Sequence, residues 1–317
     1  MSSSLQAMRP IDAVVRLLLC GVLALSACGG GSTGSSVSAG NAGGTGGSSG
    51  GSGGGTTPPA VILPTVDASA VAVGTSALPL PEGWQTGAFM QVFVRSYQDS
   101  DGDGIGDLKG LISRLDYLQD LGIRGLWLMP VHPSQDRDHG YAVKEYRNVE
   151  SQYGSLADLD ALVTAAAARG LGVILDYVVN HSAADHPAFI NARAAKDNAY
   201  RNWYLWQDTA PANWNVFGNY PWRQDPTGWY YAPFWSQRPD WHLRLPAVAS
   251  CHHDTLRFWL TRGVAGFRFD AVGLLIENGP NAFNNQPESR SFMQRIQGVL
   301  QAYQRRYMVC EAPDDSQ

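Results

Sequence analysis

The chain has 317 residues, enough for about two average domains or one large one. A hydrophobic fraction of 44% and a charged fraction of 16% allow a buried core, which excludes a wholly disordered or collagen-like chain. No apolar run reaches the roughly 18–20 residues of a spanning helix, which excludes a multi-pass membrane protein. The net charge of −5 provides no basic excess of the kind that nucleic-acid binders carry, so no nucleic-acid partner is expected.

The N-terminus has the pattern of an export signal. Arg9 and Arg16 precede an apolar run over residues 17–27, which has the length of a signal-peptide core. The run leads into the tetrad LSAC, which resembles a bacterial lipobox and ends at Cys28. We therefore predict a lipoprotein-type signal peptide over 1–28, lipidation at Cys28, and an exported protein held at the cell envelope by its lipid anchor alone. An ordinary secretory signal or a short membrane anchor is the alternative.

A linker follows, and the globular part begins near residue 85. Residues 29–57 are almost all Gly, Ser and Thr, a composition typical of a flexible tether. Residues 60–84 are low in charge and contain several prolines, so we expect an extended approach, and the whole linker is assigned to 29–84. Cys251 and Cys310 are expected to be separate thiols, because two cysteines make no disulfide framework.

Apolar segments alternate with segments of helical spacing through the rest of the chain. Ser155 is expected to cap one of the helices. The spacing predicts strands at 89–94, 123–130, 171–179, 264–272 and 307–310, and helices at 108–121, 156–168, 255–261 and 290–305. This alternation indicates a parallel sheet covered by helices, either an open doubly wound sheet or a (β/α)8 barrel.

Polar side chains at the strand ends favour the barrel. Asp176 and His181 follow the third strand, Asp270 lies on the fourth, and Glu311 follows the fifth. In barrels the active-site residues come from several strand ends on one face. No G-x-G-x-x-G sequence follows a strand, so the phosphate loop of a dinucleotide fold is missing. We predict an α/β protein with the first five strands of a (β/α)8 TIM barrel.

The predicted barrel spans 85–181 and 249–317 and is interrupted by an irregular insertion, 182–248. The insertion contains seven of the ten Trp residues. A loop of this length in a compact domain is usually functional. We expect most of these Trp side chains to pack a small subdomain, and one or two partly exposed rings to suit the apolar faces of sugars.

An acidic loop follows the first strand. Gly104 stands at loop position 6, where an EF-hand-type loop turns sharply, but Gly110 replaces the Glu of position 12. Four carboxylates and one carbonyl stand at the other ligand positions: Asp99, Asp101, Asp103, Ile105 and Asp107. We predict a structural Ca²⁺ at this loop, because four carboxylates in nine residues repel one another without a cation. A solvated acidic turn is the alternative.

Five motifs in order resemble the alpha-amylase family of glycoside hydrolases, family 13. The segment DYVVNH, Asp176 to His181, is similar to that family's D-x-x-x-N-H motif, and GFRFD, which ends at Asp270, to its G-x-R-x-D strand. The segment VCE, which ends at Glu311, is similar to its fifth-strand segment. The tetrad DHGY, Asp138 to Tyr141, resembles the loop around the cleaved sugar, and Pro239-Asp240 stands where the family has P-D-L-[ND].

The resemblance implies a role for each matching residue. Asp270 would be the nucleophile and Glu311 the general acid/base of a retaining glycosidase. Asp176 would hold Arg268, and Asn180 would be structural. The sugar at the cleavage site would be bound by Asp138, His139, Tyr141, His181 and Arg268.

The spacing gives independent support for these roles. Arg268 and Asp270 point to the same face of one strand, so the Arg charge should keep Asp270 ionised. Apolar neighbours at 308–310 should favour the protonated form of Glu311. Taken alone, an Asp–Arg pair near a strand end is often only a structural ion pair.

The implied function is hydrolysis of α-glucosidic bonds in malto-oligosaccharides or other starch-like glucans. Transglycosylases and isomerases of the same family use the same residues and are alternatives. No N-H-D segment, which carries the family's third carboxylate, follows Glu311, and Leu274 replaces a His that helps to bind a different calcium in amylases. We expect the chain to be the inactive N-terminal part of a longer hydrolase. A surface-tethered glucan-binding protein is the main alternative, and a calcium-binding adhesion protein a weaker one.

Overall fold

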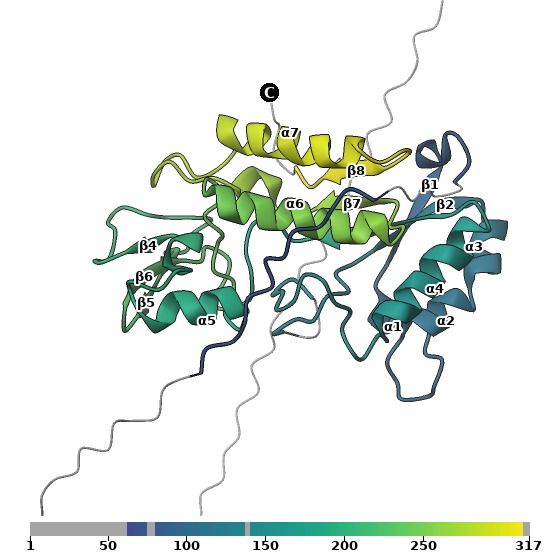
Figure 1. The fold of residues 1–317 in the computed structure, drawn as a ribbon, viewed down its shortest axis with the longest axis horizontal. Coiled ribbons are helices and arrows are strands. Elements are labelled where there is room, and N and C mark those ends of the chain that lie inside the picture. Colours follow the sequence, from purple (N-terminus) through teal and green to yellow (C-terminus); the bar gives the residue numbers. More distant parts are fainter. Residues whose placement is uncertain (1–61, 75–79, 137–139, 313–317) are drawn as a thin grey trace, which may run out of the picture. The chain divides into compact units, whose positions relative to one another are not determined.

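The computed structural model describes residues 62–74, 80–136 and 140–312, and a parallel sheet forms its centre (Figure 1). Each strand pairs in parallel with the next along the chain, in the order β1-β2-β3-β7-β8. The strands are β1 Ala88–Val92, β2 Ile123–Leu128, β3 Gly172–Tyr177, β7 Gly266–Phe269 and β8 Tyr307–Cys310. A doubly wound sheet would reverse its order at a switch point. The strand order therefore confirms the predicted first five strands of a (β/α)8 barrel.

Helices connect the successive strands. The main ones are α4 (Leu156–Ala167), α6 (Pro246–Thr261) and α7 (Pro287–Gln301). The predicted cap of α4 is confirmed, because Ser155 Oγ accepts from the backbone N–H of Asp158 and the Asp158 carboxylate accepts from that of Ser155. The predicted helical segment 255–261 forms the second half of α6, which begins at Pro246. Among the described residues no helix is long and apolar enough to cross a bilayer.

The helix predicted at 108–121 is broken in two. The segment forms α2 (Leu108–Ile112) and α3 (Leu115–Asp120), after a short α1 (Val94–Tyr97) that ends the predicted first strand two residues early. Ser113 Oγ donates to the carbonyl of Gly110, and Arg114 leaves the helical region at φ −106° and ψ 1°. The apolar spacing persists across the break, so periodicity alone predicted one continuous helix.

The insertion forms a small subdomain of its own. It contains α5 (Pro187–Ala194) and an antiparallel sheet in the order β4-β6-β5. The strands are β4 Trp206–Gln207, β5 Trp222–Asp225 and β6 Gly228–Tyr231. Trp203, Trp222 and Trp241 are buried, as expected for packing residues, whereas Trp235 is 46% exposed.

Residues 62–74 are extended and lie along the outside of the helices (Figure 1). The side chain of Asn191 in α5 donates to the carbonyl of Pro64, and the N–H of Val71 donates to Asp254 in α6. This part of the predicted approach segment is therefore bound to the globular part. The signal peptide 1–28, lipidation at Cys28 and the tether of 29–57 lie outside the described residues and stay predictions.

Trp84 packs against the inner face of the sheet at the amino ends of the strands. It is 2% exposed and lies in a short 3-10 turn, Trp84–Thr86, before β1. A Cβ on Gly172 of β3 would lie 2.2 Å from the Trp84 ring, so only glycine permits this approach. The indole N–H donates to the carbonyl of Arg305, next to β8. Trp84 therefore joins the first segment of the barrel to its last described strand.

Replacing Trp84 should destabilise the whole sheet. For Trp84→Ala we expect a loss of about 3–5 kcal/mol in the free energy of unfolding, because a large buried ring leaves a cavity. Urea unfolding measures the change. Tyr117→Ala, at a side chain that is 57% exposed, is the control and should change stability by less than about 0.5 kcal/mol. Equal midpoints for the two variants would contradict this role of Trp84.

Candidate active site

Three acidic side chains and one arginine meet at the carboxyl ends of β3, β7 and β8. Asp176 lies near the end of β3, directly opposite Arg268 in β7. Asp270 comes one residue after β7, on the same strand face as Arg268, and Glu311 comes one residue after β8. The parallel order of the strands thus brings together residues that are 135 positions apart in the sequence (176 to 311).

The guanidinium of Arg268 contacts all three carboxyl groups. Its Nη1 lies 2.9 Å from Asp176 Oδ1 and 2.8 Å from Asp270 Oδ1, and its Nη2 lies 3.0 Å from Glu311 Oε2. The ring of Trp127 in β2 lies 5.2 Å from the guanidinium carbon and donates its N–H to Asp176. One positive charge therefore holds three acidic groups together in a largely buried position.

Burial has a larger effect on the pKa of Asp270 than the neighbouring charge of Arg268. Burial raises the pKa of Asp270 above its ordinary value, and the neighbouring charges of Asp176 and Glu311 raise it further, although Arg268 lowers it. Burial also raises the pKa of Asp176 to about 6 against the effect of Arg268. Arg268 thus favours the ionised form of Asp270, as expected, but burial and the two neighbouring carboxyl groups have the larger effect on its pKa.

Glu311 is held by the backbone next to Asp270. The N–H of Ala271 donates to Glu311 Oε2 at 3.0 Å, and Ala271 has a left-handed conformation with φ +50°. Such a conformation is costly for a residue with a Cβ and is often found at functional sites. The Glu311 side chain is 41% exposed and paired with Arg268, so the apolar surroundings expected for it are not observed in the described part of the chain.

Tyr141 and His181 lie beside this cluster. Tyr141 OH donates to Asp176 Oδ2 at 3.2 Å, and its carbonyl oxygen lies 3.0 Å from His181 Nε2. The carbonyl can only accept, so Nε2 carries the proton, and burial lowers the pKa of His181 to about 3. The ring of Phe234, from the insertion, lies 5.2 Å from His181. The phenol of Tyr141 thus contacts the carboxyl cluster, the neutral imidazole of His181 contacts Tyr141, and the partly exposed ring of Phe234 lies against that imidazole.

The remaining predicted residues do not contact the carboxyl cluster in the part of the chain that the structure describes. Asp138 and His139 lie outside the described residues. Asn180 is buried, its backbone carbonyl accepts from the N–H of Trp241, and its side chain lies beside the Asp240 carboxyl group. Cys251 and Cys310 are both free, as predicted.

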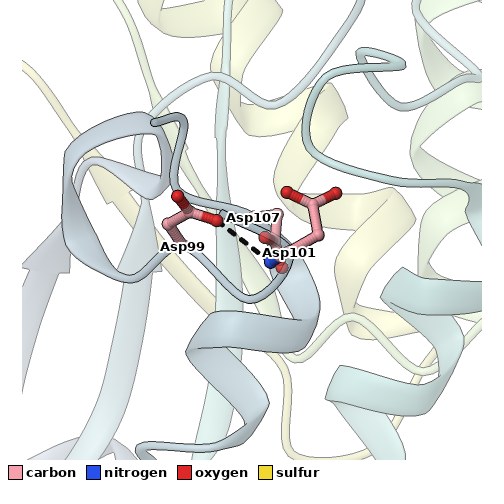
Figure 2. A group of neighbouring side chains, drawn as sticks. All are labelled: Asp99, Asp101 and Asp107. Atoms are coloured by element: carbon pink, nitrogen blue, oxygen red, sulfur yellow. Dashed lines mark hydrogen bonds between the residues drawn. The ribbon is translucent and has the colours of Figure 1, made fainter. Parts of the chain in front are cut away.

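The acidic loop brings three of its carboxylates together. Oxygen atoms of Asp99, Asp101 and Asp107 lie within 4.8 Å of one another (Figure 2). Asp99 also accepts from the N–H of Gly104, and Asp107 caps α2. This arrangement fits a divalent cation with oxygen ligands.

The fourth predicted carboxylate is not gathered there. The Asp103 carboxylate accepts from the N–H of Ile105 and is not part of this group. The predicted ligand of Ile105 is its backbone carbonyl, which stays a prediction. Three of the four predicted carboxylates are thus placed together.

The sequence patterns missed Trp127 and Ala271. Trp127 shares its strand face with Gly125, two positions earlier in β2, and an inward-facing Trp near a strand end could have identified it. No sequence signal marks the backbone conformation of Ala271.

Known proteins share this architecture and sequence. A model of the alpha amylase catalytic domain matches residues 91–317. An oligo-1,6-glucosidase of Heyndrickxia coagulans is 39% identical over 61% of this chain and 36% of its own length. An alpha-glucosidase of Schizosaccharomyces pombe is 40% identical over 62% of this chain and 36% of its own length.

Solved structures agree with these matches. Trehalose-6-phosphate hydrolase of Bacillus licheniformis superposes with a TM-score of 0.70 at 28% identity, over 74% of this chain and 45% of the hydrolase. A mutant of a trehalulose synthase superposes with a TM-score of 0.67 at 35% identity, over 72% of this chain and 44% of the synthase. The chain therefore spans less than half the length of these relatives. Because the family model matches most of the chain, the chain belongs to the alpha-amylase family of glycoside hydrolases, family 13.

Proposed function

We propose that the chain carries the carboxyl pair of a retaining glycoside hydrolase that acts on α-glucosidic bonds of malto-oligosaccharides or starch-like glucans. The observation that carries the proposal is the pairing of Asp270 and Glu311 with one guanidinium at the strand ends. Retaining glycosidases need two such groups, one on each side of the bond that is cleaved. The names of the relatives, glucosidases and an amylase among them, support the class of substrate.

The chemistry assigns a different task to each carboxyl group. Asp270 in its ionised form attacks the anomeric carbon, so that a carbon–oxygen bond forms as the glycosidic bond breaks. Glu311 gives its proton to the leaving oxygen and later accepts a proton from the water that releases the sugar. The hydroxyl of Tyr141 lies beside Asp176, and neutral His181 contacts the carbonyl of Tyr141; by family resemblance both would contact the sugar.

Turnover should depend on both carboxyl groups. An active enzyme that contains this chain is incubated with maltose, isomaltose and starch, and released glucose is measured. We expect Asp270→Asn and Glu311→Gln each to lower the rate by at least about 100-fold, since positioned acid–base groups alone contribute about 10²–10⁴. Asp197→Asn, at an exposed site in the insertion, is the matched control and should leave the rate unchanged.

Other outcomes separate the alternatives. Equal rates in wild type, Asp270→Asn and Glu311→Gln would refute the proposal. Transfer to a sugar acceptor instead of water would favour a transglycosylase or isomerase, as in the trehalulose synthase to which the fold is similar. Glucan binding without turnover in the wild type would favour a non-catalytic binding role.

We also propose that the acidic loop binds a structural Ca²⁺. The three carboxylates that lie together come from loop positions 1, 3 and 9, which supports an oxygen-ligated cation. Because Asp107 also caps α2, a cation here would fix the segment between α1 and α2. When bound, it would offset the mutual repulsion of these carboxylates.

Calcium should therefore stabilise the fold. At a free concentration of about 100 times the dissociation constant, Ca²⁺ should add about 2.7 kcal/mol to the free energy of unfolding, and EDTA should remove it. Scanning calorimetry with and without Ca²⁺ measures this. Asp99→Asn should abolish the shift, and Asp120→Asn, at an exposed carboxyl outside the loop, should retain it. A melting temperature that does not respond to EDTA would show that the loop needs no cation.

A further inference from the structure

Tyr141 contacts the carboxyl cluster from the segment between β2 and α4, and the backbone around it is held at several points. Its phenol donates to Asp176 Oδ2 at 3.2 Å, and its carbonyl accepts from His181. The preceding residue, Gly140, has φ +80°, and a Cβ there would lie 2.7 Å from the carbonyl oxygen of Pro130. The backbone at Gly140 is therefore closely confined, and a shift of Gly140 would move its neighbour Tyr141 as well.

A carboxylate of the same segment binds the backbone N–H of Gly140. The N–H donates to Asp136 Oδ1 at 3.1 Å, and Ser134 Oγ donates to the same oxygen at 2.6 Å. The other oxygen, Oδ2, accepts from Arg238 Nη2 at 2.8 Å. The side chain of Asp136 is 7% exposed and that of Arg238 is 20% exposed, so solvent screens this ion pair less than it screens a surface pair. The three donors together fix the orientation of the Asp136 carboxylate.

Arg238 belongs to the insertion, so this ion pair connects the insertion to the barrel. The residues on either side of Arg238 are paired with the segment that follows β3, because the carbonyls of Gln237 and Pro239 accept from the N–H groups of Ala184 and Ser182. This backbone pairing fixes Arg238 relative to the end of β3, from which Asp176 enters the carboxyl cluster. The guanidinium of Arg238 is thus placed by the strand end that Tyr141 contacts.

We propose that Asp136 and Arg238 are positioning residues of the candidate active site, whose ion pair holds the Gly140 N–H and so keeps the Tyr141 hydroxyl against Asp176. Among the described residues, neither side chain makes a hydrogen bond or ion pair with the carboxyl cluster, so both act through Tyr141. The insertion thereby contributes to the geometry of the site from outside it. The effect on turnover rests on the proposed function, whereas the positioning of Gly140 and Tyr141 does not.

Turnover by an active enzyme that contains this chain tests the role of Arg238. Arg238→Met removes the charge and the hydrogen bond to Asp136, and it should lower kcat/KM by about 10- to 100-fold, since a misplacement of about 1 Å can cost about 10²-fold. Arg238→Lys, which keeps the charge, should restore most of the activity. Arg193→Met is the matched control, because it breaks another ion pair of the insertion, with Asp225, and it should leave kcat/KM close to that of the wild type.

The same substitution in a second background separates positioning from a general loss of stability. If Arg238 acts through Tyr141, Arg238→Met should cause no further loss of kcat/KM in Tyr141→Ala, because the side chain to be positioned is missing. A purely structural role would lower kcat/KM by the same factor in both backgrounds. The proposal is overturned by equal losses in the two backgrounds, or by equal kcat/KM in Arg238→Met and Arg193→Met.

A measurement on the full chain needs no turnover. Hydrogen exchange at the Gly140 amide, followed by NMR after labelling with ¹⁵N-glycine, should be at least about 10-fold faster in Asp136→Ala and Arg238→Met than in the wild type, because the N–H loses its acceptor or the acceptor loses its partner. Arg193→Met should exchange as the wild type does. Unchanged exchange in Arg238→Met would overturn the positioning. Faster exchange, combined with full activity in Asp270→Asn, would support the positioning and refute the proposed hydrolysis instead.

Discussion

The site depends on one guanidinium shared among three carboxyl groups. Asp176, Asp270 and Glu311 come from different strand ends and would repel one another if Arg268 did not lie between them. The register of β3 and β7 places Arg268 directly opposite Asp176. Because all four groups are tied to strand positions, their arrangement follows from the pairing of the strands. The partial barrel is therefore also the scaffold that sets the charge balance of the site.

The two ends of β3 have different roles: its start packs in an apolar cluster, and its end holds a carboxyl group of the candidate site. Gly172, Ile174 and Asp176 share one strand face. At the start, Gly172 and Ile174 pack with the Trp84 region in an apolar cluster. At the end, Asp176 is fully buried and bonded to Arg268 and Trp127. Burying charge at one end is costly, and the apolar packing at the other end helps to offset it.

Much of this arrangement could be predicted because short sequence segments identify each strand and the polar residues that follow it. Parallel strands end on one edge, so polar residues after each strand had to meet. Three features could not be predicted. The break after α2 depends on the backbone of Arg114, the raised pKa of Asp270 depends on burial by distant residues, and the path of residues 62–74 depends on contacts with α5 and α6. The last two are decided by tertiary contacts that no local pattern contains, and the break leaves the apolar spacing unchanged, so periodicity does not detect it.

The most direct test is the stability of Arg268→Met as a function of pH. Without the positive charge of Arg268, the pKa values of the buried Asp176 and Asp270 rise further. The folded state of the variant therefore keeps these carboxyl groups protonated up to a higher pH. Groups with raised folded pKa values stabilise at low pH, and this contribution is lost as pH rises through those values. The free-energy deficit of the variant should be small near pH 5 and reach about 3–5 kcal/mol at pH 8. Arg169→Met, which breaks an exposed pair, should cost less than about 1 kcal/mol throughout. A deficit of Arg268→Met that does not change with pH would contradict the account.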